Sequence, residues 1–104
     1  MFIEQRTVSR KTPKDGKLEI SAAAAARLGA LGESFPLRTE SSQGRAQLHV
    51  MSCTCDKGTA SREHLHHFVE SEILRALEPG TDVRVALDDA HPGSLLIERA
   101  PGSD

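Results

Sequence analysis

The feature that most constrains this chain is a cluster of metal-binding residue types near its middle. Cys53-Thr54-Cys55 and His64-Leu65-His66-His67 contain both cysteines of the protein and three of its five histidines. Thiolate and imidazole are the ligands that Zn²⁺ prefers, and two cysteines with two histidines form a common tetrahedral structural site. The spacing C-x-C-x8-H-x-H is not that of the familiar zinc fingers. It still predicts that a structural zinc ion joins two neighbouring segments.

Length and composition predict one small domain with a modest core. Of the 104 residues, 38% are hydrophobic and only 3% aromatic, so few large rings are present to fill an interior. A metal cross-link would therefore add useful stability. The net charge of −2 argues against a globally basic nucleic-acid binder. Without an apolar run of spanning length or a signal-peptide core after Met1, we expect a cytoplasmic protein with reduced thiols and no membrane contact.

Alternating apolar residues separated by turn residues predict a mainly β fold with two short helices. Strands are expected over 2–10, 17–20, 34–40, 45–54, 64–69, 82–88 and 94–99, and helices over 22–31 and 71–77. Ser21 is the expected N-cap of the first helix. A turn over 12–16 would join the first two strands into a hairpin. We therefore predict one zinc-stabilised β-barrel domain over residues 1–99, followed by a disordered tail over 100–104.

Residues 62–77 admit two interpretations, which differ in the fourth zinc ligand. A single helix would place His64 and His67 on one face. A strand over 64–69 followed by a short helix would instead pair with the strand over 45–54. If Cys55 then lies opposite His64, Cys53 lies opposite His66, and the four side chains converge on one ion. The strand interpretation is preferred, with ligands Cys53, Cys55, His64 and His66.

Simpler interpretations of the same residues stay open. Cysteines in a cytosolic protein are often buried small hydrophobes, and a histidine cluster can be a polar surface. A catalytic zinc ion needs an open coordination position and usually a nearby carboxylate base, whereas four protein ligands favour a closed structural site. The sequence contains no H-E-x-x-H or G-x-S-x-G motif. The chain is therefore predicted not to be an enzyme.

Two stretches and the order of the elements carry a resemblance to a known fold. Residues 17–21 lead into the helix over 22–31, and residues 74–81 lead into Val83-Arg84-Val85. Seven strands with two short helices in this order resemble the DNA-binding pseudobarrel. That fold occurs in plant-specific transcription-factor domains and in the specificity domains of some restriction endonucleases. The resemblance implies a small seven-stranded open barrel that binds the DNA major groove with two arms.

These arms would correspond to two basic regions of the chain. The first surrounds the first two strands, where five positive residues face two negative ones between Glu4 and Lys17. The second is the loop between the fourth and fifth strands, next to the zinc ligands. Lysine and arginine would neutralise phosphates, and serine would donate to phosphates or bases. The expected nucleic-acid-binding residues are Arg6, Arg10, Lys11, Lys14, Lys17, Lys57, Ser61 and Arg62.

The alternative is a protein-interaction module of a bacterial or phage system that keeps the structural metal site. It would use a sheet edge or the acidic helix over 71–77 to bind a protein partner. Basic residues in a hairpin are also commonly a solvated surface, and lysine on an edge strand protects against aggregation. Acidic residues elsewhere in the chain would repel phosphate unless they face away. The sequence leaves the oligomeric state open.

Overall fold

The computed structural model describes residues 1–53 and 64–101, which form seven strands, two short α-helices and two 3₁₀ turns. In chain order these are β1 (Phe2–Thr7), α1 (Lys11–Asp15), β2 (Lys17–Ile20), α2 (Ala22–Leu28), η1 (Gly29–Leu31), β3 (Ser34–Arg38), β4 (Gln43–Cys53), β5 (His64–Glu70), η2 (Glu72–Ala76), β6 (Asp82–Leu87) and β7 (Leu95–Arg99).

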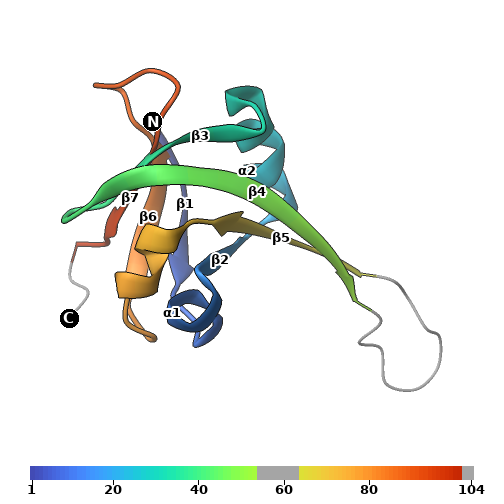
Figure 1. The fold of residues 1–104 in the computed structure, drawn as a ribbon. Helices are drawn as coiled ribbons and strands as arrows, with labels where there is room; N and C mark the ends of the chain where they lie inside the picture. Colours follow the sequence, from blue (N-terminus) through green and yellow to red (C-terminus); the bar gives the residue numbers. More distant parts are fainter. Residues whose placement is uncertain (54–63, 102–104) are drawn as a thin grey trace.

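The strands form one curled sheet in the order β1-β6-β7-β3-β4-β5-β2. The neighbours are antiparallel except for β3 and β7, which run parallel. Figure 1 shows the sheet curling so that β1 and β2, its two ends, come near each other. The result is a nearly closed barrel with one unsealed seam between these strands. The predicted mainly β fold, a seven-stranded open barrel with two short helices, is confirmed.

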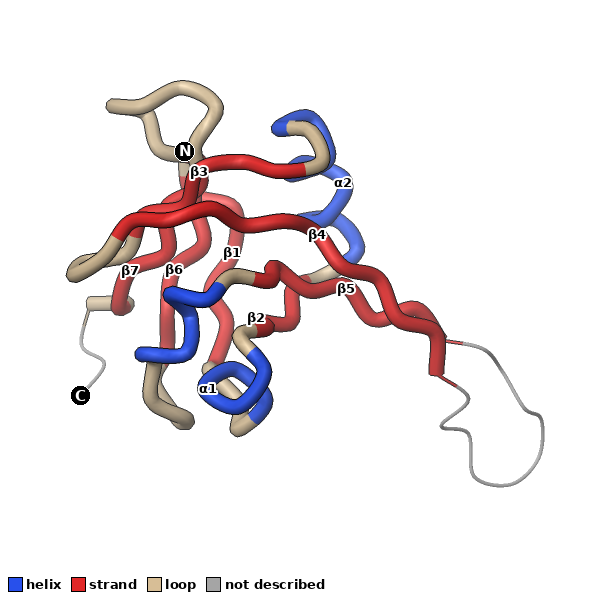
Figure 2. Tube along the Cα trace, in the orientation of Figure 1, coloured by secondary structure: helices blue, strands red, loops and turns tan. Residues whose placement is uncertain are grey.

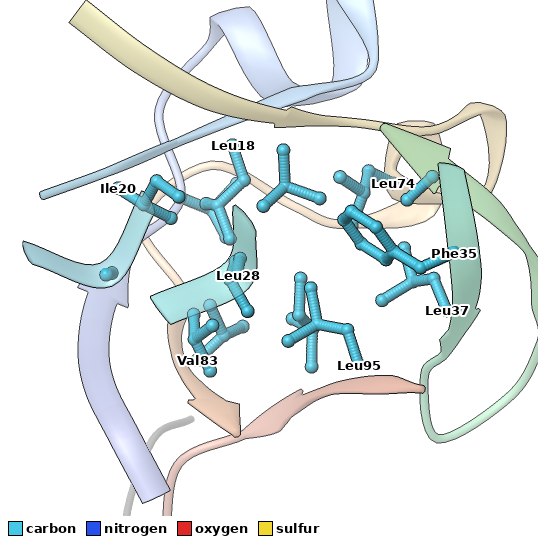
Figure 3. Packing of buried hydrophobic residues seen from close by; sticks show 14 residues of the cluster. Leu18, Ile20, Leu28, Phe35, Leu37, Leu74, Val83 and Leu95 are labelled. Atoms are coloured by element: carbon cyan, nitrogen blue, oxygen red, sulfur yellow. The ribbon is translucent and has the colours of Figure 1, made fainter. Parts of the chain in front are cut away.

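The core fills the inside of the barrel with aliphatic side chains from nearly every strand (Figure 3). On β3, Phe35 and Leu37 are fully buried while Pro36 between them is exposed, which is the alternation expected of a strand with one covered face. The same alternation applies on β6 and β7. Leu28 of α2 and Leu74 of η2 are fully buried in the same core.

The helix α2 begins where the sequence predicted but ends at Leu28, so the last three residues of the predicted helix over 22–31 form η1 instead. The Ala24 N–H donates to Ser21 Oγ at 3.1 Å, so Ser21 is the N-cap. The helix passes at Gly29 into the 3₁₀ turn η1, which ends at Gly32. Ser21 also connects the two sides of the seam, because its N–H and its hydroxyl both donate to the carboxylate of Glu4 on β1.

The predicted basic hairpin at the N-terminus is wrong. β1 ends at Thr7 and pairs with β6, while β2 pairs with β5, so β1 and β2 lie on either side of the seam. The expected turn is instead the helix α1. Proline is tolerated in the first turn of a helix, as at Pro13, and Gly16 in the left-handed region (φ 71°) ends it by donating its N–H to Thr12 O at 2.8 Å.

The folded body extends slightly beyond the boundary predicted after Arg99. Ala100 is buried, and its N–H donates to Asp82 O at 2.9 Å. Hydrogen bonding between the end of β7 and the start of β6 thus continues one residue beyond Arg99. Residues 102–104 of the proposed tail lie outside the described residues. Among the residues that the structure describes, no helix is long and apolar enough to cross a membrane.

Candidate functional site

The most conspicuous feature outside the core is a two-stranded ribbon formed by β4 and β5, which projects beyond the barrel (Figure 2). At its base, Leu48 lies opposite Val69, which is fully buried. Toward its end, Met51 lies opposite His66 and Cys53 lies opposite His64. Residues 49, 51 and 53 therefore share one face of the ribbon with residues 64, 66 and 68.

The predicted strand over 64–69 is confirmed, and the alternative of one helix over 62–77 is wrong, because β5 and η2 are separate elements. The predicted register is wrong by two residues. We expected Cys55 opposite His64, and the structure pairs His64 with Cys53. Alternation fixes only which face a residue occupies, whereas burial of Val69 fixes the register. A slip of two residues leaves the shared face intact, but it places His66 opposite Met51 and not opposite Cys53 as expected.

The zinc site itself stays a prediction. Cys55 lies outside the described residues, as do Lys57, Ser61 and Arg62 of the expected second arm. Cys53 and His64 are placed by their backbone pairing. Within residues 1–53 and 64–101, no group of three or more His, Cys, Asp or Glu side chains is arranged to hold a metal ion.

His66 is the predicted ligand whose side chain is described, and it is held by residues from two other elements. Its Nδ1 atom lies 2.9 Å from Oε2 of Glu19 on β2. Its ring stacks on Phe68, with centroids 6.5 Å apart and planes at 27°. The Nζ atom of Lys11 on α1 lies 5.0 Å from the centre of the Phe68 ring. These contacts connect α1, β5 and β2 on the outer face of the sheet.

Sequence reasoning missed Glu19 because it was visible only as an outward residue between two apolar ones. Leu18 and Ile20 are buried in the core, so strand alternation turns Glu19 outward. Its proximity to His66 depends on the pairing of β2 with β5, in which Glu19 lies opposite Phe68. A local pattern could not reveal this pairing between distant segments.

His67, the alternative ligand, lies on the other face of β5. It lies opposite Ile20 on β2 and Val50 on β4. Because Ile20 is buried in the core, His67 is on the inward face of β5. Its Nδ1 atom is buried and has no hydrogen-bond partner within the described part of the protein. Because the face with His67 is opposite to the one with His64 and His66, β5 favours His66 as the ligand.

Four of the five predicted basic residues of the first arm lie together around α1. Arg10 precedes the helix, Lys11 and Lys14 belong to it, and Lys17 begins β2. No carboxylate among the described residues lies within ion-pair distance of these four side chains. Arg6 differs, since it lies on β1 across the seam with Nε 3.8 Å from Oε2 of Glu4.

Beside α1 lies a hollow of about 350 Å³ with mixed charge. Its lining includes three acidic residues, Asp15, Glu70 and Glu72, and two arginines, Arg45 and Arg75. Arg75 Nε is 3.7 Å from Glu72 Oε1. The positive potential of this region therefore belongs to α1 rather than to the hollow.

Apolar side chains are exposed along the ribbon. Val50 is 51%, Met51 41% and Leu65 61% exposed. Val50 is on the same side of β4 as Leu48, which is half-buried against the core. Val50 is nevertheless exposed, whereas Val69, opposite Leu48, is fully buried.

A separate ionic cluster fixes the turn between β6 and β7. The nearly buried Asp88 accepts from Arg38 Nη1 at 2.9 Å and from the Ala90 N–H at 3.1 Å, and His91 Nδ1 lies 3.3 Å from it. Desolvation by itself would raise the pKa of Asp88. The Ala90 hydrogen bond and the charges of Arg38 and His91 outweigh it, so the pKa is below its ordinary value.

Comparisons with known proteins found no family model, no curated protein and no solved structure that matches this chain. The geometry of the chain itself is therefore the basis for assigning a function. Its two prominent features are the basic group around α1 and the projecting ribbon that carries predicted zinc ligands.

Proposed function

We propose that this chain is a non-catalytic, zinc-binding domain of the cytoplasm that binds duplex DNA. α1 would contact the phosphate backbone on one side, and the end of the β4–β5 ribbon would enter the groove on the other. The single observation that carries the proposal is the group of four cations around α1 that have no carboxylate partner among the described residues: Arg10, Lys11, Lys14 and Lys17.

Unpaired cations favour this function for an electrostatic reason. A lysine or arginine that already pairs with a carboxylate gains little from a phosphate, whereas an unpaired one releases counterions condensed on the DNA when it binds. Arg10 and Lys14 are four residues apart and so lie on one side of α1. The overall charge of −2 does not oppose binding, because acidic residues elsewhere can face away from the duplex.

The ribbon supports the same proposal. It extends out from the barrel. The sequence between its two strands contains Lys57, Ser61 and Arg62, which the pseudobarrel resemblance assigns to the second DNA-binding arm. A two-stranded ribbon has the dimensions to enter the major groove. The contact of Lys11 with Phe68 joins α1 to the base of this ribbon, so the two proposed arms share one support.

The proposed zinc ion would stiffen the far end of the ribbon. Two-stranded ribbons are marginally stable in water unless something else holds them. Thiolates and imidazoles on facing strands would close a tetrahedral site and cross-link β4 to β5. The pairing of Cys53 with His64, with His66 on the same face, supports this arrangement. Cys53, Cys55, His64 and His66 stay the proposed ligands.

DNA binding is tested by measuring affinity for a duplex across a salt series. If four cations contact phosphates, the slope of log K against log salt should be about −3.6. The double variant Arg10→Glu with Lys14→Glu should bind more weakly, with a slope of about −1.8. These two side chains are exposed, so circular dichroism should be unchanged.

The matched control is Arg27→Glu with Arg99→Glu, which changes the net charge equally at exposed sites on α2 and β7. The control should bind DNA like the wild-type protein. If the two double variants lose affinity equally, the effect is one of net charge and α1 is not a binding site. No binding by the wild-type protein at low salt refutes the function as a whole.

The protein-interaction module is the second candidate, and one observation favours it. Val50, Met51 and Leu65 expose apolar surface on the ribbon, as interfaces with protein partners often do. If this second candidate is correct, the double variant Val50→Ser with Leu65→Ser should abolish binding to the protein partner. Substitutions in α1 should then leave that binding unchanged. The two candidates are thus distinguished by which pair of substitutions removes binding, and a DNA interaction that the α1 pair leaves unchanged would refute the role given to α1.

A further inference from the structure

We infer that a hollow beside η2 binds a primary alkylammonium ion, with the aliphatic chain of the ligand against the core and its charged head at the rim. The hollow has a volume of about 190 Å³ and lies between the turn after β3, η2 with the turn that follows it, and the strands β6 and β7. It shares no residue with α1 or with the β4–β5 ribbon, so the inference depends neither on DNA binding nor on zinc.

The floor of the hollow is part of the hydrophobic core. Val83 of β6, which points into the core in Figure 3, and Ile97 of β7 are each 1% exposed. Ile73 of η2 and Leu77, which follows it, are half-buried against the same core. Drug-sized ligands occupy pockets of about 300–1,000 Å³. This hollow is smaller, so it suits a short aliphatic chain rather than a larger ligand.

One polar group of the hollow has no partner in the fold. Thr81 precedes β6 and, by strand alternation, shares the inward face of Val83. It is 8% exposed, and its hydroxyl makes no hydrogen bond with any residue that the structure describes. Its backbone is already used, because its N–H donates to Glu78 O at 3.3 Å and its carbonyl oxygen accepts from the Val8 N–H at 2.8 Å. A ligand that bonds to this hydroxyl satisfies a group that the fold leaves unpaired.

The charged residues around the hollow favour a cationic ligand. Glu40 and Glu78 are exposed and line the hollow, and neither forms an ion pair within residues 1–53 and 64–101. Arg99 also lines the hollow, and its backbone N–H donates to Oε1 of Glu40 at 3.0 Å. The two carboxylates outnumber the single guanidinium of this lining, so the potential in the hollow is negative.

An alkylammonium ion matches the floor, the hydroxyl and the carboxylates together. Its methylene chain would leave water for the aliphatic floor. Its head has three N–H donors and no acceptor. Thr81 and Glu78 belong to one hydrogen-bonded turn, so a hydroxyl and a carboxylate that can both accept lie on the same side of the hollow. Hydrogen bonds between an ammonium group and a carboxylate are stronger than those between neutral groups.

Two sources offer this chemistry, a free alkylamine and the side chain of a lysine on a protein partner. n-Butylamine reproduces the chain and the head of a lysine side chain, and Nα-acetyl-lysine methylamide adds the peptide backbone on either side. Tighter binding of the blocked lysine would assign the hollow to a lysine of a protein partner. Equal or tighter binding of n-butylamine would assign it to free amines. Either result supports the inference, because the recognised group is the same.

The test is a titration of the full chain at pH 7, followed by the amide cross-peaks of its ¹⁵N–¹H correlation spectrum. n-Butylamine should shift the peaks of residues that line the hollow, Thr81 and Val83 among them, until they saturate. Butyrate has a similar chain and the opposite charge, so it should not shift them. Equal shifts with n-butylamine and butyrate, or no saturable shift with either amine probe, would overturn the inference.

Two variants separate the carboxylate from the hydroxyl. Glu78→Gln should weaken n-butylamine binding about tenfold, because a charged acceptor is lost at an exposed position. Thr81→Val keeps the shape of the side chain and removes its hydroxyl, so it should weaken binding about 3–10-fold. Since that hydroxyl has no partner among the described residues, Thr81→Val should leave the free energy of unfolding unchanged or higher.

Glu33→Gln is the matched control. Glu33 is exposed, lies outside the hollow, and its replacement changes the net charge by the same amount as Glu78→Gln. Glu33→Gln should bind n-butylamine like the wild-type chain. Equal losses of affinity in Glu33→Gln and Glu78→Gln would reduce the effect to net charge and overturn the site. A loss of stability in Thr81→Val would show that the hydroxyl serves the fold, which also contradicts the inference.

Discussion

Replacement of Gly16 by alanine should destabilise the domain more than the same replacement at Gly80 or Gly29. Gly16 ends α1 with φ 71°, and a Cβ atom built on it would lie 2.7 Å from the carbonyl oxygen of Ser71. That oxygen belongs to backbone, so it cannot rotate away. Ser71 also donates its N–H to Gly16 O at 2.8 Å, so any separation of the two segments weakens this bond.

The expected magnitude follows from three contributions. A side chain in the left-handed region costs about 1–2 kcal/mol. Relief of the steric overlap with Ser71 costs about 1–3 kcal/mol, as in other overpacked sites. The lower entropy of the unfolded chain returns about 0.4–1 kcal/mol. We therefore expect Gly16→Ala to lower the free energy of unfolding by about 3 kcal/mol.

Two other glycines separate these contributions. Gly80 has φ 89° but nothing within 4 Å of its added Cβ atom, so Gly80→Ala should lose only about 1 kcal/mol. Gly29 has φ −56° and equally open surroundings. Gly29→Ala should be neutral or stabilising by about 0.5–1 kcal/mol.

Urea unfolding followed by circular dichroism measures all three variants. The order of stability should be Gly29→Ala, then Gly80→Ala, then Gly16→Ala, with the m-value unchanged. A loss at Gly16 no larger than the loss at Gly80 would refute the argument that α1 is packed tightly against the turn before η2. Since α1 carries the proposed phosphate contacts, Gly16→Ala should also weaken DNA binding at temperatures where the variant is still folded.

Two further predictions concern the seam and the turn between β6 and β7. Ser21→Ala should lower the free energy of unfolding by about 1–2 kcal/mol, because Ala24 loses its cap and Glu4 loses a donor; Ser21→Thr, which keeps the hydroxyl, should recover most of it in the same urea assay. The pKa of Asp88 is lowered in the folded state, so its stabilising effect is present above the unfolded pKa of about 3.9 and is lost as the pH falls through the folded value. Asp88→Asn should therefore be less stable than the wild-type protein at pH 7, and the stabilities of the two proteins should converge at the lowest pH. Thermal unfolding across the acid range measures this difference. A difference that stays constant with pH would contradict the role given to Arg38.

Most elements of the fold could be predicted because their signals are local. Alternation in 34–38 and 82–87 marks strands, and Ser21 before five alanines marks the start of a helix. The prediction failed over 11–15, where Pro13 and Gly16 indicated a turn and the chain forms α1. The same two residue types occur at helix starts and ends, so the local pattern does not distinguish a turn from a one-turn helix.

The candidate site was harder to predict than the fold. The sequence indicated that residues 53, 64 and 66 share a face, because that follows from alternation within each strand. It could not fix the register, and it gave no indication that Glu19 would meet His66 or that Lys11 would cover Phe68. These contacts join residues that are far apart in the chain.

The sequence by itself determined the order of the strands along the chain, the face that each residue occupies and the supply of zinc-binding residue types. Only the tertiary structure decided that β1 and β2 lie apart at the seam, that β2 pairs with β5, and that β4 and β5 project as a ribbon. The physical reason is that alternation and capping depend on neighbouring residues. Pairing and register depend instead on which arrangement of all seven strands buries the shared apolar face.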